Sequence, residues 1–535
     1  MKRMLYQMII VILLFSSFLF MNSPTKTSAV EIQPYGKLKP PSESFTPGDW
    51  FLGSTPPNYN STRPPIVFVQ GKNGSSTSWY GETEYHGIND MYTKAYEAGY
   101  QTVFVQLYDA AGNGSSSQYK NGRLLATKLA QISAHFGGKK VNIIAHSKGG
   151  PDTQAALVTY GAHPYVGRVI TLASPHHGSN LADLANSWYA GWLASFLGAN
   201  DEGTASLQIG EMAEFRSVID NHANSRKNKY YTLTGTNQGP ALSALSIGGL
   251  YLSSYGSNDG LVNDWSSKLP YGTHLFTDSK YDHDNIRTGS AVFSRIEPYL
   301  RSSSTAGVAS LSEQPAEEEE NISTTHNQII HGGSLETNKW IEQSFSLNEA
   351  TADGEVTIYT ATADVETEMI SPSGIVYSQS HVSQASKGET SFLGGAYVHT
   401  LKQSNMEAGN WVIRMKTNAK KDAYLLTAKI DDKEPLILEM PGKVKQKDAQ
   451  FVLKSTAKSS LVTDLLTFDI HLTNEHGADI KNTGSISKFN SDTYFGDLPD
   501  VPESGIYNLT IDVKGKNTTG HAVNRTIVRS IYIEK

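Results

Sequence analysis

The chain of 535 residues contains no cysteine. This absence excludes disulfide frameworks, thiolate zinc sites, iron–sulfur clusters, cysteine nucleophiles and lipid attachment through cysteine. An excess of one charge is also missing, because 45 Lys and Arg stand against 52 Asp and Glu, a formal net charge of −7. Such a balance gives no reason to expect nucleic acid or an anionic membrane as a partner. Aromatic residues form 10% of the chain, so wholesale disorder is excluded.

Long apolar runs are confined to the N-terminus. Lys2 and Arg3 precede the apolar stretch 8–20, and the small residues of 27–29 follow it. This order predicts a secretory signal peptide over residues 1–29 and a secreted, extracellular bacterial protein. An uncleaved membrane anchor is the alternative, because the run is close to the length that spans a bilayer.

The region after the signal divides into an extended arm and an α/β unit. Residues 30–65 hold eight of the 21 prolines, which predicts an extended arm rather than a helix or a central strand. Residues 66–301 alternate β-branched runs with helical patterns. The strand-like runs are 66–69, 102–107, 141–145 and 169–172, and the clearest helical pattern is 120–136. This alternation predicts a mostly parallel sheet flanked by helices.

The C-terminal 230 or so residues have a different pattern. Residues 302–325 are rich in serine and carry four consecutive glutamates, which indicates a solvated linker. Beyond it, apolar and polar residues alternate in short segments separated by turn residues. We predict two β-sandwich modules, 326–433 and 434–535, the second of them immunoglobulin-like.

The segment Val141–Gly150 points to a nucleophile. A buried strand runs into Ala-His-Ser-Lys-Gly, and a helical pattern over 151–160 follows. A tight strand–turn–helix bend of this kind lifts the Ser147 hydroxyl above the strand ends, and the small residues Ala145 and Gly149 allow close packing. The alternative is that Ser147 only caps a helix.

Serine is a weak nucleophile unless a base removes its proton. In enzymes with this bend, the acid and then the histidine follow the serine along the chain. His283 lies in a polar loop and is the favoured base, whereas His274 lies in a strand-like run typical of a structural histidine. Asp259, in a turn flanked by glycine, is the favoured acid over the competing residues Asp264, Asp278 and Asp282.

The oxyanion of a tetrahedral intermediate requires two hydrogen-bond donors. The backbone N–H of Lys148 follows the nucleophile directly. The loop after the first core strand, Gln70–Gly74, supplies the second donor, for which we expect the backbone N–H of Lys72. No role is assigned to the side chains of the two lysines.

Several ordered motifs resemble those of the bacterial true lipases of the α/β-hydrolase fold. The box at 145–149 is similar to the Ala-first box of small Bacillus lipases. The segment 171–179, and the run from 230–235 to 257–262, resemble Pseudomonas-type lipases. The resemblance covers residues 64–300. It implies an α/β-hydrolase fold with Ser147 as nucleophile, Asp259 as acid and His283 as base.

Two departures from the family pattern stand out. Gln70 replaces the usual histidine before Gly71, which leaves the backbone donor in place. The family's calcium site uses an acid shortly upstream of the catalytic one, but no Asp or Glu lies between Asp220 and Asp259. We therefore assign no calcium site and expect no cofactor.

Substrate contacts are suggested by one aromatic segment. Apolar residues recur at helical spacing in 187–198 and predict one apolar face, which belongs either to a core helix or to a lid over an acyl pocket. These residues are Trp188, Trp192, Leu193 and Phe196.

The sequence favours a secreted serine carboxylester hydrolase, a lipase or esterase that cleaves acylglycerol esters through an acyl-enzyme. An extracellular polyhydroxyalkanoate depolymerase with the same triad is an alternative. An inactive hydrolase-fold protein that binds a surface is another, although the intact triad argues against it. The C-terminal modules are expected to attach to a lipid or polymer surface or to stabilise the chain.

Overall fold

The structure is a computed structural model. It describes residues 30–31, 34–35, 37–38, 45–111, 115–197, 201–306, 322–347, 349–378, 381–387, 389, 392–429, 436–455, 461–480 and 484–535. The predicted signal peptide lies outside the described residues. So do residues 307–321 of the predicted linker and the predicted boundary at 433–434.

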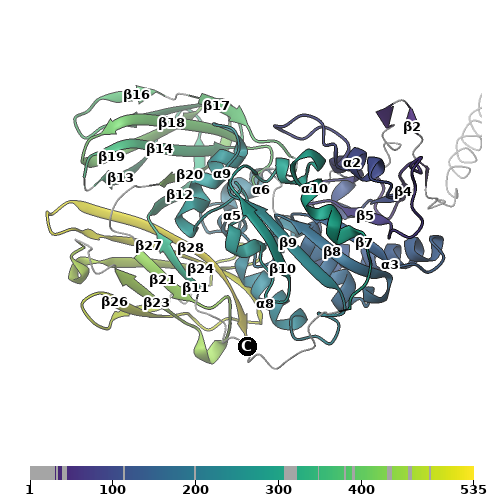
Figure 1. Cartoon of the computed structure of the whole chain (residues 1–535). Helices are drawn as coiled ribbons and strands as arrows, with labels where there is room; N and C mark the ends of the chain where they lie inside the picture. The colour runs from purple at the N-terminus through teal and green to yellow at the C-terminus, as the bar shows by residue number, and fades with distance from the viewer. Residues whose placement is uncertain are drawn as a thin grey trace, which may run out of the picture.

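An eight-stranded sheet forms the centre of the N-terminal domain (Figure 1). Its strand order is β1-β4-β6-β5-β7-β8-β9-β10, and each pairing is parallel except that of β4 with β6. The prediction of a mostly parallel sheet is therefore confirmed. The strands are β1 (Val30–Glu31), β4 (Trp50–Leu52), β5 (Ile66–Val69), β6 (Thr102–Val105), β7 (Val141–His146), β8 (Val166–Leu172), β9 (Lys229–Gly235) and β10 (Thr273–Asp278).

Apolar cores cover both faces of this sheet, so the central strands β5, β6 and β7 are buried along their whole length. The α-helices of the domain are α2 (Met91–Glu97), α3 (Gln118–His135), α4 (Gly149–Gln154), α5 (Asn180–Ala185), α6 (Gly191–Leu197), α7 (Glu202–Ala205), α8 (Ile209–Ile219), α9 (Ala244–Leu252) and α10 (Gly289–Leu300). The helical pattern expected over 120–136 is α3. The pattern expected over 151–160 is α4 continued by a π-helical turn, Ala155–Thr159.

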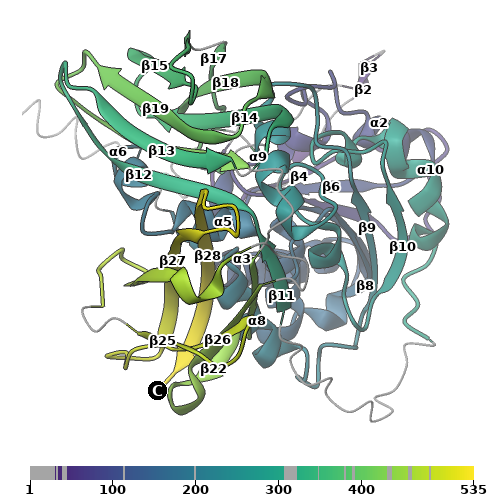
Figure 2. The ribbon, with the colours of Figure 1, turned by 90° about the vertical axis from the view of Figure 1, so that its left-hand side faces the viewer.

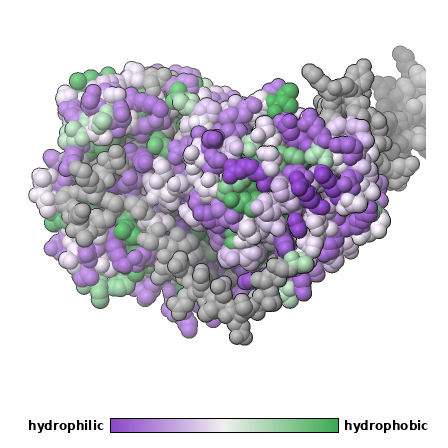
Figure 3. Space-filling model, in the orientation of Figure 1, coloured by the Kyte–Doolittle hydropathy of each residue, from purple (hydrophilic) through white to green (hydrophobic). Residues whose placement is uncertain are grey.

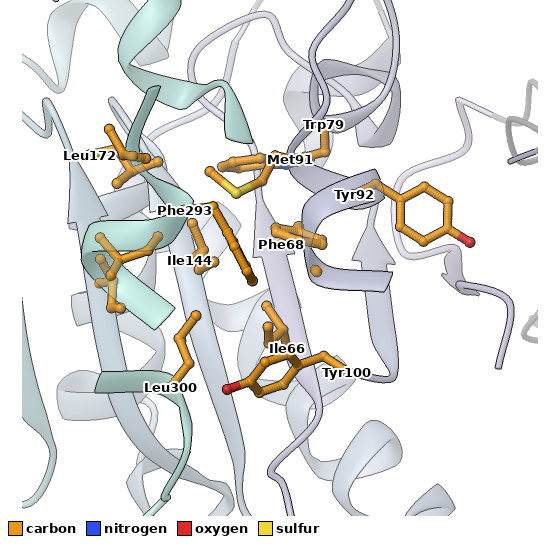
Figure 4. Close-up of a cluster of buried hydrophobic side chains, with 14 of the residues drawn as sticks. Ile66, Phe68, Trp79, Met91, Tyr92, Tyr100, Ile144, Leu172, Phe293 and Leu300 are labelled. Atoms are coloured by element: carbon orange, nitrogen blue, oxygen red, sulfur yellow. The ribbon is translucent and has the colours of Figure 1, made fainter. Parts of the chain in front are cut away.

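The two apolar cores lie on opposite faces of the sheet because successive strand side chains alternate. On β5, Ile66 and Phe68 face one core, in which α10 contributes Phe293 and Leu300 (Figure 4). Val67 and Val69 face the other core, which is closed by residues of α3. Neither face of the central strands is left to solvent, and the polar residues of this domain gather at the strand ends.

The predicted arm contributes to the sheet. Trp50 and Phe51 of β4 are buried, and β4 pairs with β6 as the second strand from the edge. None of the arm's prolines falls in β4. Nearer the N-terminus, a short hairpin joins β2 (Pro34–Tyr35) and β3 (Lys37–Leu38). Two strands of the predicted arm, β1 and β4, thus belong to the hydrolase sheet.

The C-terminal region forms two antiparallel sandwiches, as the alternating pattern predicts. The first sandwich packs sheet β12-β20-β14-β18-β17 on sheet β13-β19-β15-β16. Its strands are β12 (Gln328–Glu336), β13 (Ile341–Leu347), β14 (Thr351–Thr360), β15 (Val365–Ile370), β16 (Val376–Ser378), β17 (His381–Gln384), β18 (Tyr397–Met406), β19 (Gly409–Thr417) and β20 (Lys421–Lys429).

The second sandwich packs sheet β11-β21-β23-β26-β25 on sheet β22-β28-β27-β24 and has a core of its own. Its first strand, β11, precedes the first sandwich in the chain and pairs with β21. Part of the predicted linker is therefore a strand. The strands are β11 (Ile322–His326), β21 (Leu436–Met440), β22 (Lys443–Lys445), β23 (Gln450–Ser455), β24 (Thr467–Asn474), β25 (Ser485–Lys488), β26 (Thr493–Asp497), β27 (Gly505–Lys516) and β28 (Ala522–Glu534).

Both sandwiches lie against the same side of the N-terminal domain, as the two perpendicular views show (Figures 1 and 2). A buried cluster is shared across this contact. From the N-terminal domain come apolar residues of α5, α6 and α9, and from the sandwiches come Ile330, Tyr359, Leu393, Leu425 and Val528. We call it the shared cluster.

The face of the molecule in Figure 3 is mostly hydrophilic, with hydrophobic residues in small separate patches. Within the described residues, no helix is both long enough and apolar enough to cross a membrane.

Candidate active site

Ser147 stands on a sharp bend between β7 and α4. Its φ is +52°, a left-handed conformation that few residues other than glycine adopt. Its N–H donates to Leu172 O at 2.9 Å, which ties the bend to β8. The bend is packed closely against the end of strand β5, because a Cβ on Gly149 would lie only 2.5 Å from Gln70 O. The bend thus holds Ser147 directly after the C-terminal end of strand β7.

Ser147, His283 and Asp259 form one hydrogen-bonded chain. Ser147 Oγ lies 3.0 Å from His283 Nε2, and His283 Nδ1 lies 2.8 Å from Asp259 Oδ2. The other oxygen, Asp259 Oδ1, accepts the N–H groups of Leu261 and Val262. All three side chains are buried, with Ser147 the most open at 6%. Because Asp259 is held by backbone donors, its free oxygen is fixed towards the imidazole.

The charge of Asp259 controls the protonation of His283. Burial alone lowers the pKa of this histidine. The Asp259 carboxylate outweighs burial, and Glu389 adds to it, so the pKa of His283 is raised above its ordinary value. An imidazole tuned in this way can take a proton from a serine and hold it.

The residues that competed with His283 and Asp259 for their roles lie outside this hydrogen-bonded chain. His274 bonds to Thr232 and Thr277. Each remaining aspartate has its own partner outside the triad: Lys268 for Asp264, Arg295 for Asp278 and His86 for Asp282.

The two expected oxyanion donors belong to segments that meet at Ser147. Lys148 follows the nucleophile, and Lys72 follows Gly71, where an added Cβ would stand 2.9 Å from Ser147 Cβ. Both lysine side chains point away into ion pairs. Lys148 Nζ is buried 2.9 Å from Asp152, and Lys72 Nζ lies 3.2 Å from Asp201. These pairs anchor the two segments that carry the expected oxyanion donors.

The aromatic segment does not form the single apolar face that its spacing predicts. Leu193 is fully buried in the shared cluster, whereas Trp192 and Phe196, one turn apart on α6, are 52% and 48% exposed. Trp188 precedes α6 and stacks on His471 of the second sandwich, with ring centroids 4.5 Å apart. The reason is that neighbouring residues on a helix diverge by about 100°. From α6, Leu193 and Leu197 therefore turn towards the shared cluster, and Trp192 and Phe196 turn away from it.

Sequence reasoning missed Glu389, which comes from the loop between β17 and β18 of the first sandwich. Its carboxylate reaches the candidate site, where Oε2 lies 3.0 Å from His146 Nδ1 and Oε1 lies 3.4 Å from Arg287 Nη1. Ser78 Oγ donates a third hydrogen bond to Oε1. A lone glutamate 242 positions from Ser147 carries no local signal that could have revealed this contact.

A metal site is not evident. Among the described residues, no three His, Asp or Glu side chains are grouped so as to hold a metal ion. The stretch upstream of Asp259 lacks the acidic ligand that the calcium site of the resembling family needs.

Comparison with known proteins bears on the fold and on the family of the chain. Residues 64–226 match the α/β-hydrolase fold family. The Bacillus licheniformis lipase BlEst2, solved in its propeptide form, is 31% identical with a TM-score of 0.72, and the match covers 92% of this chain and 98% of that one. The mature form of that lipase is 44% identical, with a TM-score of 0.44, over 48% of this chain and all of that one.

A triacylglycerol lipase of Vibrio cholerae is 33% identical over 126 residues, which are 24% of this chain. The chain spans 37% of the length of that curated relative. Fold and comparisons together define the class as α/β hydrolases. Within that class the chain belongs to the bacterial lipases.

Proposed function

We propose that the protein is a secreted serine carboxylester hydrolase that cleaves acylglycerol esters. The observation that carries this proposal is the hydrogen-bonded chain from Ser147 Oγ through His283 to Asp259. Relatives named as lipases support the lipid ester as substrate.

In the proposed reaction, Ser147 Oγ attacks the ester carbonyl while His283 Nε2 takes its proton. The Asp259 carboxylate stabilises the imidazolium, and the N–H groups of Lys72 and Lys148 receive the oxyanion. His283 then protonates the departing alcohol. Water, activated by the same imidazole, releases the acid from the acyl-enzyme.

We also propose that the two sandwiches act as a pro-region that covers the site. The shared cluster buries apolar residues of α5, α6 and α9, and Glu389 lies among residues next to Ser147. A relative with the same two-part architecture was solved in a form described as its propeptide form. Attachment of the sandwiches to a surface stays a prediction.

The test compares p-nitrophenyl esters from acetate to palmitate as substrates for the full chain and for a chain of residues 45–306, after circular dichroism has shown the latter to be folded. The short chain is expected to be at least tenfold more active. Ser147→Ala should lower kcat by several powers of ten, whereas Ser290→Ala, at an exposed serine on α10, should not. Retention of activity in folded Ser147→Ala would refute the mechanism, and equal activity of the two chain lengths would refute the pro-region.

A further inference from the structure

We propose that Ser78, His146 and Arg287 form a carboxylate-binding subsite beside Ser147, which Glu389 fills in the full chain and which takes a free carboxylate when Glu389 is absent. The inference rests on the proposed function only in taking Ser147 as the reacting group.

The subsite is built from buried donors on three separate segments of the hydrolase domain. Ser78 Oγ and Arg287 Nη1 face one oxygen of the Glu389 carboxylate, and His146 Nδ1 faces the other. The guanidinium of Arg287 is fixed before any ligand arrives, since Nη2 donates to Asp284 at 2.8 Å and Nη1 to Ser78 O at 3.0 Å. Donors that are held in place by their own domain need little reordering to bind an anion.

Two glycines leave the space that the carboxylate occupies. A Cβ on Gly74 would lie 2.4 Å from Glu389 Oε1. A Cβ on Gly71 would lie 2.8 Å from Glu389 Oε2 and 2.9 Å from Ser147 Cβ. The Glu389 carboxylate and Ser147 therefore both lie next to Gly71, in the loop that carries the expected oxyanion donor.

The protons available on His146 favour a carboxylic acid or carboxylate as the ligand of this subsite. His146 Nε2 lies 2.9 Å from His283 O, a carbonyl that can only accept, so Nε2 carries a proton. Burial lowers the pKa of His146, and the facing Glu389 carboxylate opposes this effect, so a proton on Nδ1 depends on the acid that faces it. The contact of His146 Nδ1 with Glu389 Oε2 is attractive when one proton lies between the two atoms. A carboxylate can share that proton and also meet the charge of Arg287, whereas an ester or an alkyl chain can do neither.

The electrostatics agree with an anion in this place. Burial alone would raise the pKa of Glu389, but the charge of Arg287 and the hydrogen bonds from His146 and Ser78 lower it to about 2. The loop that carries Glu389 is held at further points. Ser386 Oγ donates to Glu84 at 2.7 Å, and Leu393 is buried in the shared cluster.

The test uses the full chain and the variant Glu389→Ala, which keeps Cβ and loses a CH₂–COO⁻ group of the size of acetate. Thermal unfolding is followed with increasing acetate, and with acetamide as the neutral ligand of equal shape. Acetate should raise the Tm of Glu389→Ala with half-saturation at roughly 1–10 mM. Acetamide should be at least tenfold weaker, and the wild-type chain should not respond to either. Glu342→Ala, at an exposed glutamate of the same sandwich, is the matched control.

Hydrolysis of p-nitrophenyl butyrate gives a second readout. Glu389→Ala should be at least tenfold more active than the wild-type chain, and acetate should inhibit it. Adding Ser78→Ala, which removes one donor, should weaken the acetate effect five- to tenfold in both assays. Equal responses to acetate and acetamide, or a wild-type chain that responds as Glu389→Ala does, would overturn the subsite. Absence of Ser147-dependent turnover would count against the proposed function alone, because the thermal assay needs no catalysis.

Discussion

The two sandwiches meet the hydrolase domain through different chemistry. The first sends a carboxylate to the candidate site and apolar residues to the shared cluster. The second places strand β28 along α5 and α8, where the buried Asp183 accepts hydrogen bonds from Ser530 N and Oγ and from Ile209 N. The carboxylate at the candidate site and the hydrogen bonds to Asp183 thus come from different sandwiches, so a substitution can disturb one of these contacts without removing the other.

The largest expected effect comes from Asp183→Ala. The change leaves the N–H groups of Ile209 and Ser530 without their acceptor and leaves the buried Arg529 without its nearest opposite charge. We expect the free energy of unfolding of the full chain to fall by about 3–5 kcal/mol, measured by urea denaturation. Asp500→Ala, at an exposed aspartate of the second sandwich, should cost less than about 0.5 kcal/mol. Equal losses in both variants would contradict the assigned role of β28.

Leu393→Ala tests the apolar part of the first sandwich's contact. Leu393 is fully buried in the shared cluster, so its truncation should cost about 2–4 kcal/mol. Because Leu393 also positions the loop of Glu389, the variant should react faster at Ser147 with a small phosphonate. Leu465→Ala, at a leucine that is 53% exposed, should change neither quantity. If Leu393→Ala loses stability without reacting faster at Ser147, then the loop that carries Glu389 is held in place by other contacts.

Acid should erase the stabilisation that the Glu389 carboxylate provides. Its pKa is lowered from 4.5 to about 2, so the contribution is complete above pH 4.5 and disappears as the pH falls from 4.5 to 2. At pH 6 we expect the Tm of the wild-type chain to exceed that of Glu389→Ala by about 2–4 °C, which corresponds to roughly 1 kcal/mol. Near pH 2 we expect no difference in Tm between the two proteins. A Tm difference between the two proteins that stays constant from pH 6 to pH 2 would show that the contact of Glu389 is not ionic.

The smallest expected effect concerns the ring pair between Trp188 and His471. The rings are stacked with an interplanar angle of 3°. Trp188→Ala should cost roughly 0.5–1.5 kcal/mol, measured by urea denaturation. Trp192→Ala removes the same side chain from an exposed site on α6 and should cost less than 0.5 kcal/mol. The reverse order would place Trp192, not Trp188, at the contact with the sandwiches.

Much of the hydrolase domain could be predicted because its signals are local. The β-branched runs became β5, β6, β7 and β8 because parallel strands covered on both faces must be apolar along their length. The bend at Ser147 was visible because strand, small residues and helix follow one another directly. His283 and Asp259 could be chosen from loop context, and the structure brings both to Ser147.

What could not be predicted depends on contacts between distant segments. Glu389 is one glutamate in a polar loop, and only the docking of a separate module brings it to Arg287 and His146. The aromatic segment shows the same limit, because helical spacing groups Trp192 with Phe196 but does not say which side of α6 a sandwich covers. The sequence assigns residues 322–325 to the linker, because β21, the partner of strand β11, lies more than 100 residues further along the chain.

That strand has a consequence for how the chain could be matured. Since β11 leaves the hydrolase domain, joins the sheet of the second sandwich and only then continues into the first, the two sandwiches are interlocked by their connectivity. A protease that cuts ahead of Ile322 would set both free as one body. A cut after His326 would instead leave the edge strand β11 covalently attached to the hydrolase half and separate the rest of both sandwiches from it.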